Sequence, residues 1–262
     1  MKKRAFTLIE LLVVIAIIAI LMAILMPSLK LAKDQAYGVI CMSNIRSLLQ
    51  AWYMYQDEND GVMVCGHCPR DAAFKDKKLY PDGLWVEPPQ DVARNYTGDS
   101  DPSLEDEIRG IERGQLIRWT KNVGIYRCPA DRRKRDPAQS TYRTYSLAGG
   151  MNGEENYAFT HRGIRKYTEI KGPATKYVFV EESDWRGWNM GSWVVNPTGD
   201  TWIDPLAVWH NKRSCLGFAD IHAEKHRWLD RRTIEMSDKQ QFGLTHPNNP
   251  DLKFMQQGYM LK

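Results

Sequence analysis

The sequence predicts an α+β protein, in which a long N-terminal helix packs on an antiparallel β-sheet head with long loops. The first observation is an apolar run at residues 6–26, long enough for the first half of the helix to be transmembrane. Apolar residues, Val39 and Ile40 among them, then recur at three- and four-residue spacing as far as Tyr55, which is typical of an amphipathic helix that packs one face under the head. Further along, short β-favouring segments alternate with Pro- and Gly-rich stretches, which predicts strands and loops.

The apolar run follows a basic leader at residues 2–4 and contains one charge, Glu10. A helix of this length spans about 31 Å at about 1.5 Å per residue, which matches a bilayer core. A lone carboxylate at mid-membrane costs on the order of 2.5 to 3.5 kcal/mol. Glu10 therefore needs a compensating partner.

The residues at the start of the run form a recognisable pattern: Arg4, Ala5, Phe6, Thr7, Leu8, Ile9 and Glu10, with Pro27 after the run. This pattern resembles the class III signal of type IV pilins and type II secretion pseudopilins. The resemblance implies that a prepilin peptidase cuts between Ala5 and Phe6 and methylates the new amino terminus. Glycine is usual at the position of Ala5, so we expect slower processing here.

The same resemblance implies assembly roles for Glu10 and Pro27. Glu10 becomes the fifth residue of the mature chain and pairs with the terminal ammonium of a neighbouring subunit, which fixes the axial offset between subunits. Pro27 falls where such subunits carry a proline that loosens the helix. The alternative is an uncleaved membrane anchor with Glu10 near the membrane interface.

Three later segments extend the resemblance to a subgroup of large pilin-like proteins that is abundant in planctomycete-type bacteria. They are Cys41 to Arg46, Tyr126 to Asp131, and His210 followed after nine residues by Asp220. The tail of this subgroup typically reads His, nine residues, Asp-Gly. Ile221 stands here in place of the glycine.

These features divide the chain into a leader (1–5), a transmembrane and assembly helix (6–26), an amphipathic helix (27–58) and an α+β head (59–262). The helix is expected to run from about Phe6 to Gln56. The basic leader marks the cytoplasmic side, so the protein is predicted to cross the inner membrane once with an extracytoplasmic head. Without the leader the formal net charge falls from +4 to about +1, so no nucleic-acid binding is expected.

Within the head, residues 177–181 are the clearest strand, and residues 214–219 and 222–228 form a predicted hairpin. A β-branched Ile221 resists positive φ, so the turn is expected to differ from type I′ or to be longer. One short helix is expected within residues 104–119. The last stretch, residues 245–262, is predicted to be a loosely held tail.

The five cysteines allow one or two disulfides in an oxidising compartment. Cys65 and Cys68 form one CxxC pair, and Cys128 is a candidate partner for a disulfide. A structural zinc site is the alternative, with further ligands from His67, Cys128 or Cys215. Free thiols remain a third interpretation.

Two other groups are candidate metal sites. His210, Asp220 and His222, with His226 nearby, offer ligands for a divalent ion. The favoured alternative is a hydrogen-bonded pair, in which Asp220 caps the turn and His210 braces it. Acidic residues between Asp99 and Glu107 are candidates for calcium, although they lack the spacing of an EF-hand, and a solvated acidic loop is favoured. No cofactor is therefore certain.

Five tryptophans cluster within one stretch: Trp185, Trp188, Trp193, Trp202 and Trp209. Core packing, a subunit interface and glycan contact are the three interpretations. No catalytic motif is present, and the chain is predicted not to be an enzyme.

The favoured function is a pilin-like structural subunit of a type II secretion pseudopilus or a type IV-like pilus, assembled into a periplasmic or surface filament. Its expected partners are copies of itself, other pilin-like subunits, the prepilin peptidase, the inner-membrane assembly platform and membrane lipid. The alternatives are a membrane-tethered protein that binds envelope glycans and, third, a metal-dependent hydrolase.

Overall fold

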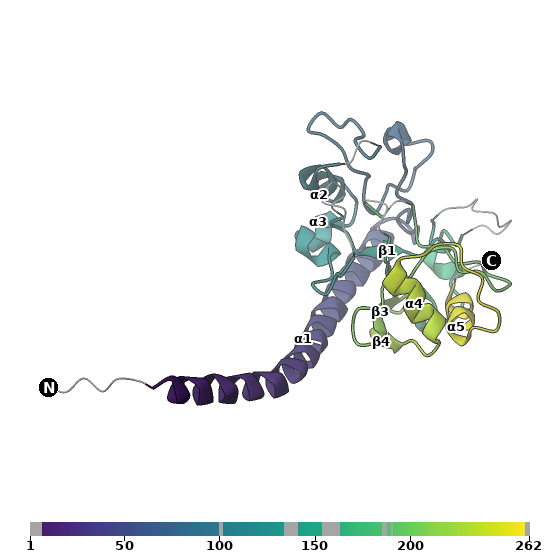
Figure 1. Cartoon of the computed structure of the whole chain (residues 1–262). Helices are drawn as coiled ribbons and strands as arrows, with labels where there is room; N and C mark the ends of the chain where they lie inside the picture. Colours follow the sequence, from purple (N-terminus) through teal and green to yellow (C-terminus); the bar gives the residue numbers. More distant parts are fainter. Residues whose placement is uncertain are drawn as a thin grey trace.

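The structure is a computed structural model that describes residues 7–99, 102–133, 141–153, 163–184, 188–189 and 191–259. The predicted processing residues Ala5 and Phe6 lie outside the described residues, as do Asp101 and Trp185. A single long helix, α1 (Leu8–Glu58), projects from a head that contains the sheet and the shorter helices (Figure 1).

Helix α1 is continuous from membrane-type sequence to head, as the sequence predicted. Thr7 caps its start, where its side-chain oxygen accepts a hydrogen bond from the backbone N–H of Glu10. Pro27 lies inside the helix and offers no backbone N–H to the preceding turn. The helix bends rather than breaks between its two halves (Figure 1).

Only the last third of α1 is buried by the head. The buried residues are Gly38, Cys41, Ile45, Leu48, Leu49, Ala51, Trp52, Tyr55 and Gln56. Val39 and Ile40, which the spacing placed on the packed face, are instead 60% and 46% exposed. The prediction was wrong there because the sheet covers a single stripe, which begins at Gly38 and runs along its three- and four-residue neighbours.

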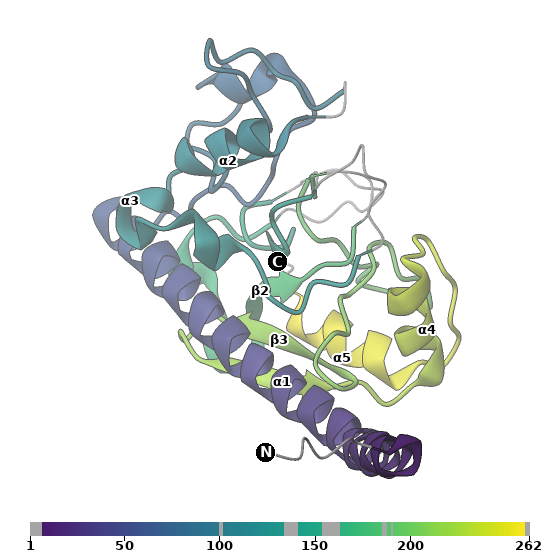
Figure 2. The same ribbon diagram turned by 60° about the vertical axis from the view of Figure 1, so that its left-hand side comes forward.

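The sheet has four antiparallel strands in the order β1-β2-β3-β4. These are β1 (Tyr145–Leu147), β2 (Tyr177–Glu181), β3 (Arg213–Phe218) and β4 (Ala223–Arg227). The predicted strand at 177–181 and the predicted hairpin are both confirmed. Helix α1 lies along one face of the sheet, and α4 and α5 lie on the other side (Figure 2).

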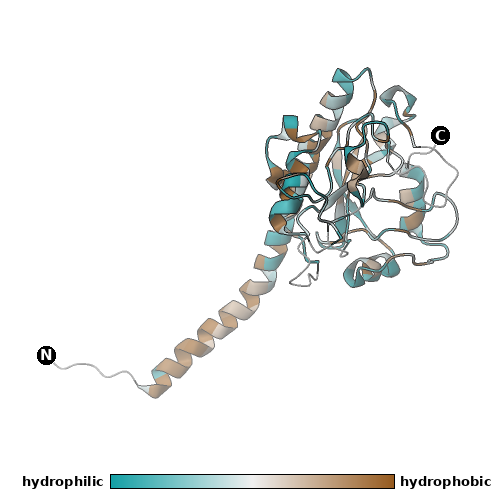
Figure 3. Ribbon diagram, turned by 90° about the horizontal axis from the view of Figure 1, so that it is seen from above, coloured by the Kyte–Doolittle hydropathy of each residue, from teal (hydrophilic) through white to brown (hydrophobic). Residues whose placement is uncertain are grey.

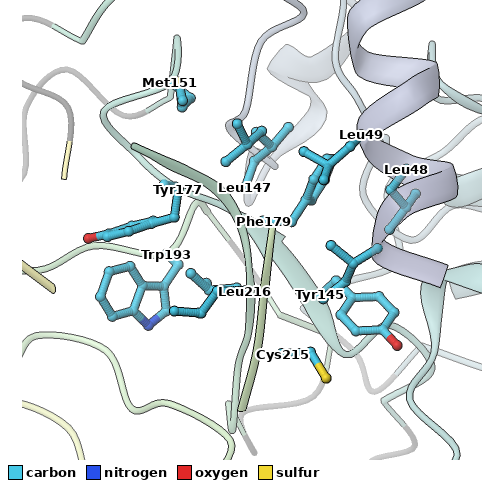
Figure 4. Close-up of a cluster of buried hydrophobic side chains, with 14 of the residues drawn as sticks. Leu48, Leu49, Tyr145, Leu147, Met151, Tyr177, Phe179, Trp193, Cys215 and Leu216 are labelled. Atoms are coloured by element: carbon cyan, nitrogen blue, oxygen red, sulfur yellow. The ribbon is translucent and has the colours of Figure 1, made fainter. Parts of the chain in front are cut away.

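The core covers both faces of the sheet, and one part of it lies between α1 and the strands. Leu48 and Leu49 of the helix are buried here, and Leu49 lies beside Phe179 of β2 (Figure 4). Leu216 is also buried, but it lies beside Trp193 on the other side of the strands (Figure 4). Gly217 permits the close approach of α1 to β3, because a Cβ there would lie 2.5 Å from Cγ2 of Ile45. A larger residue in β3 would push the helix away.

The turn between β3 and β4 contains four residues, Ala219 to His222, and is therefore longer than a type I′ turn, as predicted. Ile221 nevertheless adopts φ +74°, contrary to the expectation that its branched side chain would avoid positive φ. Two observations explain this. Its N–H donates to the carbonyl of Phe218, and its side chain packs against the core, which offsets the backbone strain.

The region expected to hold one short helix contains two, α2 (Leu104–Glu112) and α3 (Ile117–Thr120). They separate at Gly114, where a Cβ would lie 2.3 Å from the carbonyl oxygen of Trp85. Four 3₁₀ turns are also described, at Ala72–Lys75, Val123–Tyr126, Tyr167–Glu169 and Pro173–Thr175.

The predicted loose tail is instead ordered against the sheet. After α4 (Arg231–Lys239) the chain forms α5 (Pro250–Gly258), capped by Asn249. Leu252 and Met255 are buried, and Tyr177 of β2 donates a hydrogen bond to the carbonyl of Met255 at 2.7 Å. The Pro and Asn residues that indicated a loop are the first residue and the cap of this helix.

Replacing Gly217 by Ala tests the close contact between α1 and β3. We expect the free energy of unfolding of the full chain in detergent to fall by about 1 to 3 kcal/mol, because the added methyl group overpacks against Ile45. In the Gly217→Ala/Ile45→Ala double variant the clash is absent, so its loss of stability should be smaller than the sum of the two single losses. Strict additivity in denaturant titrations would contradict this account.

Candidate functional site

The membrane-type half of α1 presents apolar side chains on every side. Residues 8–33 are exposed all round the helix, and α1 is the one helix in the described residues that is long and apolar enough to cross a membrane. The hydropathy colouring changes from mostly apolar to mixed where the helix reaches the head (Figure 3). This half is therefore a surface that requires lipid or neighbouring helices.

Glu10 lies in the first turn of this surface and is held by Thr7. Its carboxylate accepts hydrogen bonds from the backbone N–H of Thr7 at 2.8 Å and from the Thr7 hydroxyl at 2.9 Å. Together with the cap this forms a reciprocal capping box. A negative charge at this position also suits the positive end of the helix dipole.

The structure places Cys128 beside a cysteine that lies outside the CxxC pair. Cys128 lies against Cys41 of α1, with the two sulfur atoms 2.7 Å apart. Cys65 instead lies in a backbone bridge with Leu84. Cys128 therefore belongs to a second cluster, which the sequence analysis did not identify.

The predicted metal residues also separate. The backbone N–H of His210 donates to the carbonyl of Arg213 at the start of β3, whereas Asp220 and His222 lie beyond the other end of this six-residue strand. At about 3.3 Å per residue, the strand places roughly 17 Å between them. Asp220 and His222 bind one another at 2.5 Å, and Asp220 also accepts a hydrogen bond from the backbone N–H of His222, so Asp220 caps the turn as expected. His210 does not brace this turn and lies too far away to share a metal ion with them.

His210 instead joins Cys128 and Glu181 in the buried core. Its Nε2 lies 3.0 Å from Oε1 of Glu181 and 3.4 Å from Sγ of Cys128. Burial alone would lower the pKa of His210, but the negative charge of Glu181 raises it. Burial raises the pKa of Glu181, against the opposing effect of His210.

Cys41 and Glu181 are the residues of this cluster that sequence reasoning missed. Cys41, Cys128 and His210 each belong to a different one of the three motif segments, and this was the signal in the sequence that could have linked them. Glu181 gave no signal beyond ending an apolar strand. Only the pairing of β2 with β3 brings it to the others.

The acidic run has structural partners. Glu105, Asp106 and Glu107 occupy the first turn of α2, where negative charge stabilises the helix start. Asp106 pairs with Arg109, and Glu107 accepts a hydrogen bond from the backbone N–H of Tyr142 at 2.7 Å.

The described tryptophans of the cluster are core residues. Trp188, Trp193, Trp202 and Trp209 are all buried, and Trp193 packs edge-on against Tyr177 of β2. A sugar-binding platform needs exposed ring faces, which these four do not offer. The glycan interpretation therefore loses its supporting observation among the described residues.

The loop that carries Cys128 is anchored by a buried ion pair. Asp131 and Arg133 are each 1% exposed at their side chains, and Nη2 of Arg133 lies 2.8 Å from Oδ2 of Asp131. Arg133 also donates to the carbonyls of Arg143 and Asp184. These bonds fix the Cys-Pro-Ala-Asp segment in the core.

Comparison with known proteins agrees with the site on α1. Residues 1–26 match the family described as "Prokaryotic N-terminal methylation motif". A stretch of 59 residues is 44% identical to the type IV wide pilus major component PilA4 of Thermus thermophilus, covering 22% of this chain and 45% of that protein. The chain thus spans less than half the length of this relative. No solved structure matches.

These similarities support a type IV pilin-like protein, as the first residues indicated. The chain carries the N-terminal methylation motif together with a helix that is long and apolar enough to cross a membrane. The similarity to PilA4 covers less than a quarter of the chain, so it leaves most of the head without a counterpart.

Replacing Asp131 by Ala tests the anchor of the Cys128 loop. The free energy of unfolding should fall by about 3 to 5 kcal/mol, because the Arg133 charge stays buried without its partner. Arg132→Ala is the matched control: its pair with Asp34 is half exposed, so the change should be below about 1 kcal/mol. Equal losses for the two variants in denaturant titrations would refute the difference in burial.

Proposed function

We propose that this chain is a filament subunit of a type II secretion pseudopilus or a type IV-like pilus, trimmed before Phe6 by the prepilin peptidase. The observation that carries the proposal is the half of α1 that is apolar and exposed on every side, with a single carboxylate. Such a surface is stable in lipid before assembly and against neighbouring helices afterwards.

Glu10 supplies the register of assembly in this proposal. Trimming before Phe6 creates a terminal ammonium four residues from Glu10 in the sequence. In an apolar bundle, the ammonium of one subunit and the Glu10 carboxylate of its neighbour neutralise one another. The hydrogen bonds from Thr7 hold the Glu10 carboxylate at the end of the helix where this pairing with the neighbour's ammonium would form.

The rest of the chain fits outward presentation. The basic leader keeps the start of the chain on the cytoplasmic side of the inner membrane, so the head emerges on the other side. The assembly platform and the peptidase meet the exposed half of α1, and copies of the chain or other pilin-like subunits replace them in the filament. The separated His210 and Asp220 give no support to the hydrolase alternative.

The processing step predicts a defined mature chain. Intact mass and N-terminal sequencing of protein from membrane and sheared-surface fractions should show a methylated Phe6 as the first residue. Ala5→Gly should speed the appearance of this form, because glycine is the residue the peptidase motif usually carries. An unprocessed chain that begins at Met1 and stays in the membrane would contradict the proposal.

Glu10→Ala should lower the yield of sheared filaments by at least about tenfold, since an unpaired ammonium in an apolar bundle costs more than about 1.4 kcal/mol. Processing before Phe6 should continue. Asp57→Asn, an exposed change at the other end of α1, serves as the control and should assemble normally. Wild-type yields from the Glu10 variant would end this account.

A further inference from the structure

Four buried side chains from four distant segments meet where α1 enters the head. They are Cys41 of α1, Cys128 of the Cys-Pro-Ala-Asp loop, Glu181 at the end of β2 and His210 before β3. One ligand atom from each lies within 4.8 Å of all the others. The tertiary fold creates this convergence, because no two of these residues are neighbours in the sequence.

The electron-rich atoms crowd a single nitrogen. Nε2 of His210 lies 3.0 Å from Oε1 of Glu181 and 3.4 Å from Sγ of Cys128. Sγ of Cys41 lies 2.7 Å from Sγ of Cys128. Nδ1 of His210 is buried and has no hydrogen-bond partner among the described residues. One imidazole nitrogen can make a good hydrogen bond to only one partner. The carboxylate oxygen and the two sulfur atoms around Nε2 therefore converge on a common point, and such a point suits a cation.

Backbone groups orient two of the four ligands. The N–H of Ala130 donates to Sγ of Cys128 at 3.3 Å, and the N–H of Cys215 donates to Oε2 of Glu181 at 2.7 Å. Such outer bonds fix the direction of a ligand atom and stabilise its negative charge. The Lys225 side chain reaches Gly38, one turn before Cys41, and adds a positive charge nearby.

We propose that Cys41, Cys128, Glu181 and His210 bind one divalent metal ion of the zinc class, which ties α1 to the head. Two sulfurs, one imidazole nitrogen and one carboxylate oxygen suit a closed tetrahedral zinc site, whereas calcium and magnesium require oxygen ligands.

On binding, both thiols lose their protons to solvent, two metal–sulfur bonds form, and no group changes its oxidation state. Sulfur ligands at about 2.3 Å from tetrahedral zinc stand about 3.8 Å apart. The two sulfur atoms must therefore separate by about 1 Å, which small rotations about the Cα–Cβ bonds provide.

A Cys41–Cys128 disulfide is the competing outcome, because a bond of about 2.05 Å also requires only a small movement of the sulfurs. It would account for the two cysteines, but not for the approach of His210 and Glu181 to the same point. The two outcomes differ in metal content and in thiol state, and both quantities can be measured on the wild-type chain.

The full chain, purified from membranes in detergent without chelators, should contain about one zinc ion per molecule by elemental mass spectrometry. After unfolding in a chelator, Cys41 and Cys128 should both react with an alkylating reagent. A peptide pair linked through these cysteines, or a fully reduced chain without metal, would overturn the proposal.

Matched variants locate the ion. His210→Ala and Glu181→Gln should each lower zinc affinity at least about tenfold in chelator competition, since loss of an outer partner alone costs about that much. Cys65→Ser, from the separate CxxC pair, should leave the affinity unchanged. An equal loss from Cys65→Ser would overturn the assignment.

X-ray absorption at the zinc edge of the wild-type chain requires no variant to fold. The expected first shell is two sulfurs at about 2.3 Å and two lighter atoms at about 2.0 to 2.2 Å. A shell without sulfur would refute the site. None of these measurements depends on filament assembly, so the metal proposal and the assembly proposal can fail separately.

Discussion

The contact between the last third of α1 and the face of β3 is the constraint on which the rest of the molecule depends. Gly217 has no side chain, so Ile45 and Leu49 approach the strand backbone closely. This approach sets the depth of the core, and it brings Cys41 down to the level of the buried ends of β2 and β3. Because the helix is continuous, the same contact also sets the direction in which the apolar half of α1 leaves the head.

Much of this architecture could be predicted because it depends on local patterns. The apolar first half of α1, its single charge at Glu10 and the strand at 177–181 follow from composition and periodicity. The buried stripe of α1 could not be located from spacing alone, since Val39 and Ile40 are as apolar as the residues that pack. What selects the stripe is the position of the sheet, which no helical pattern encodes.

The head shows where local patterns fail. Asn249 and Pro250 indicate a loop in isolation, but they start a helix once Leu252 and Met255 have a sheet to pack against. The predicted metal site failed for a related reason. His210 and the Asp220–His222 pair lie at opposite ends of an extended strand, so they are far apart in space although they are close in the sequence. Conversely, the core brings together residues that are far apart in the sequence, namely Cys41, Cys128 and His210. The fourth member of this cluster, Glu181, could be found only from the pairing of β2 with β3.

The unbroken course of α1 through Pro27 has a mechanical consequence. In a filament under tension, force enters through the apolar half and reaches the head along the helix axis. The force is then parallel to the contact surface, so the buried residues of α1 from Gly38 to Tyr55 share the load. A force perpendicular to the surface would instead break their contacts one after another. The bend between the two halves of α1 (Figure 1) is a more flexible section before this contact, so the head can tilt while the contact between α1 and the sheet stays intact.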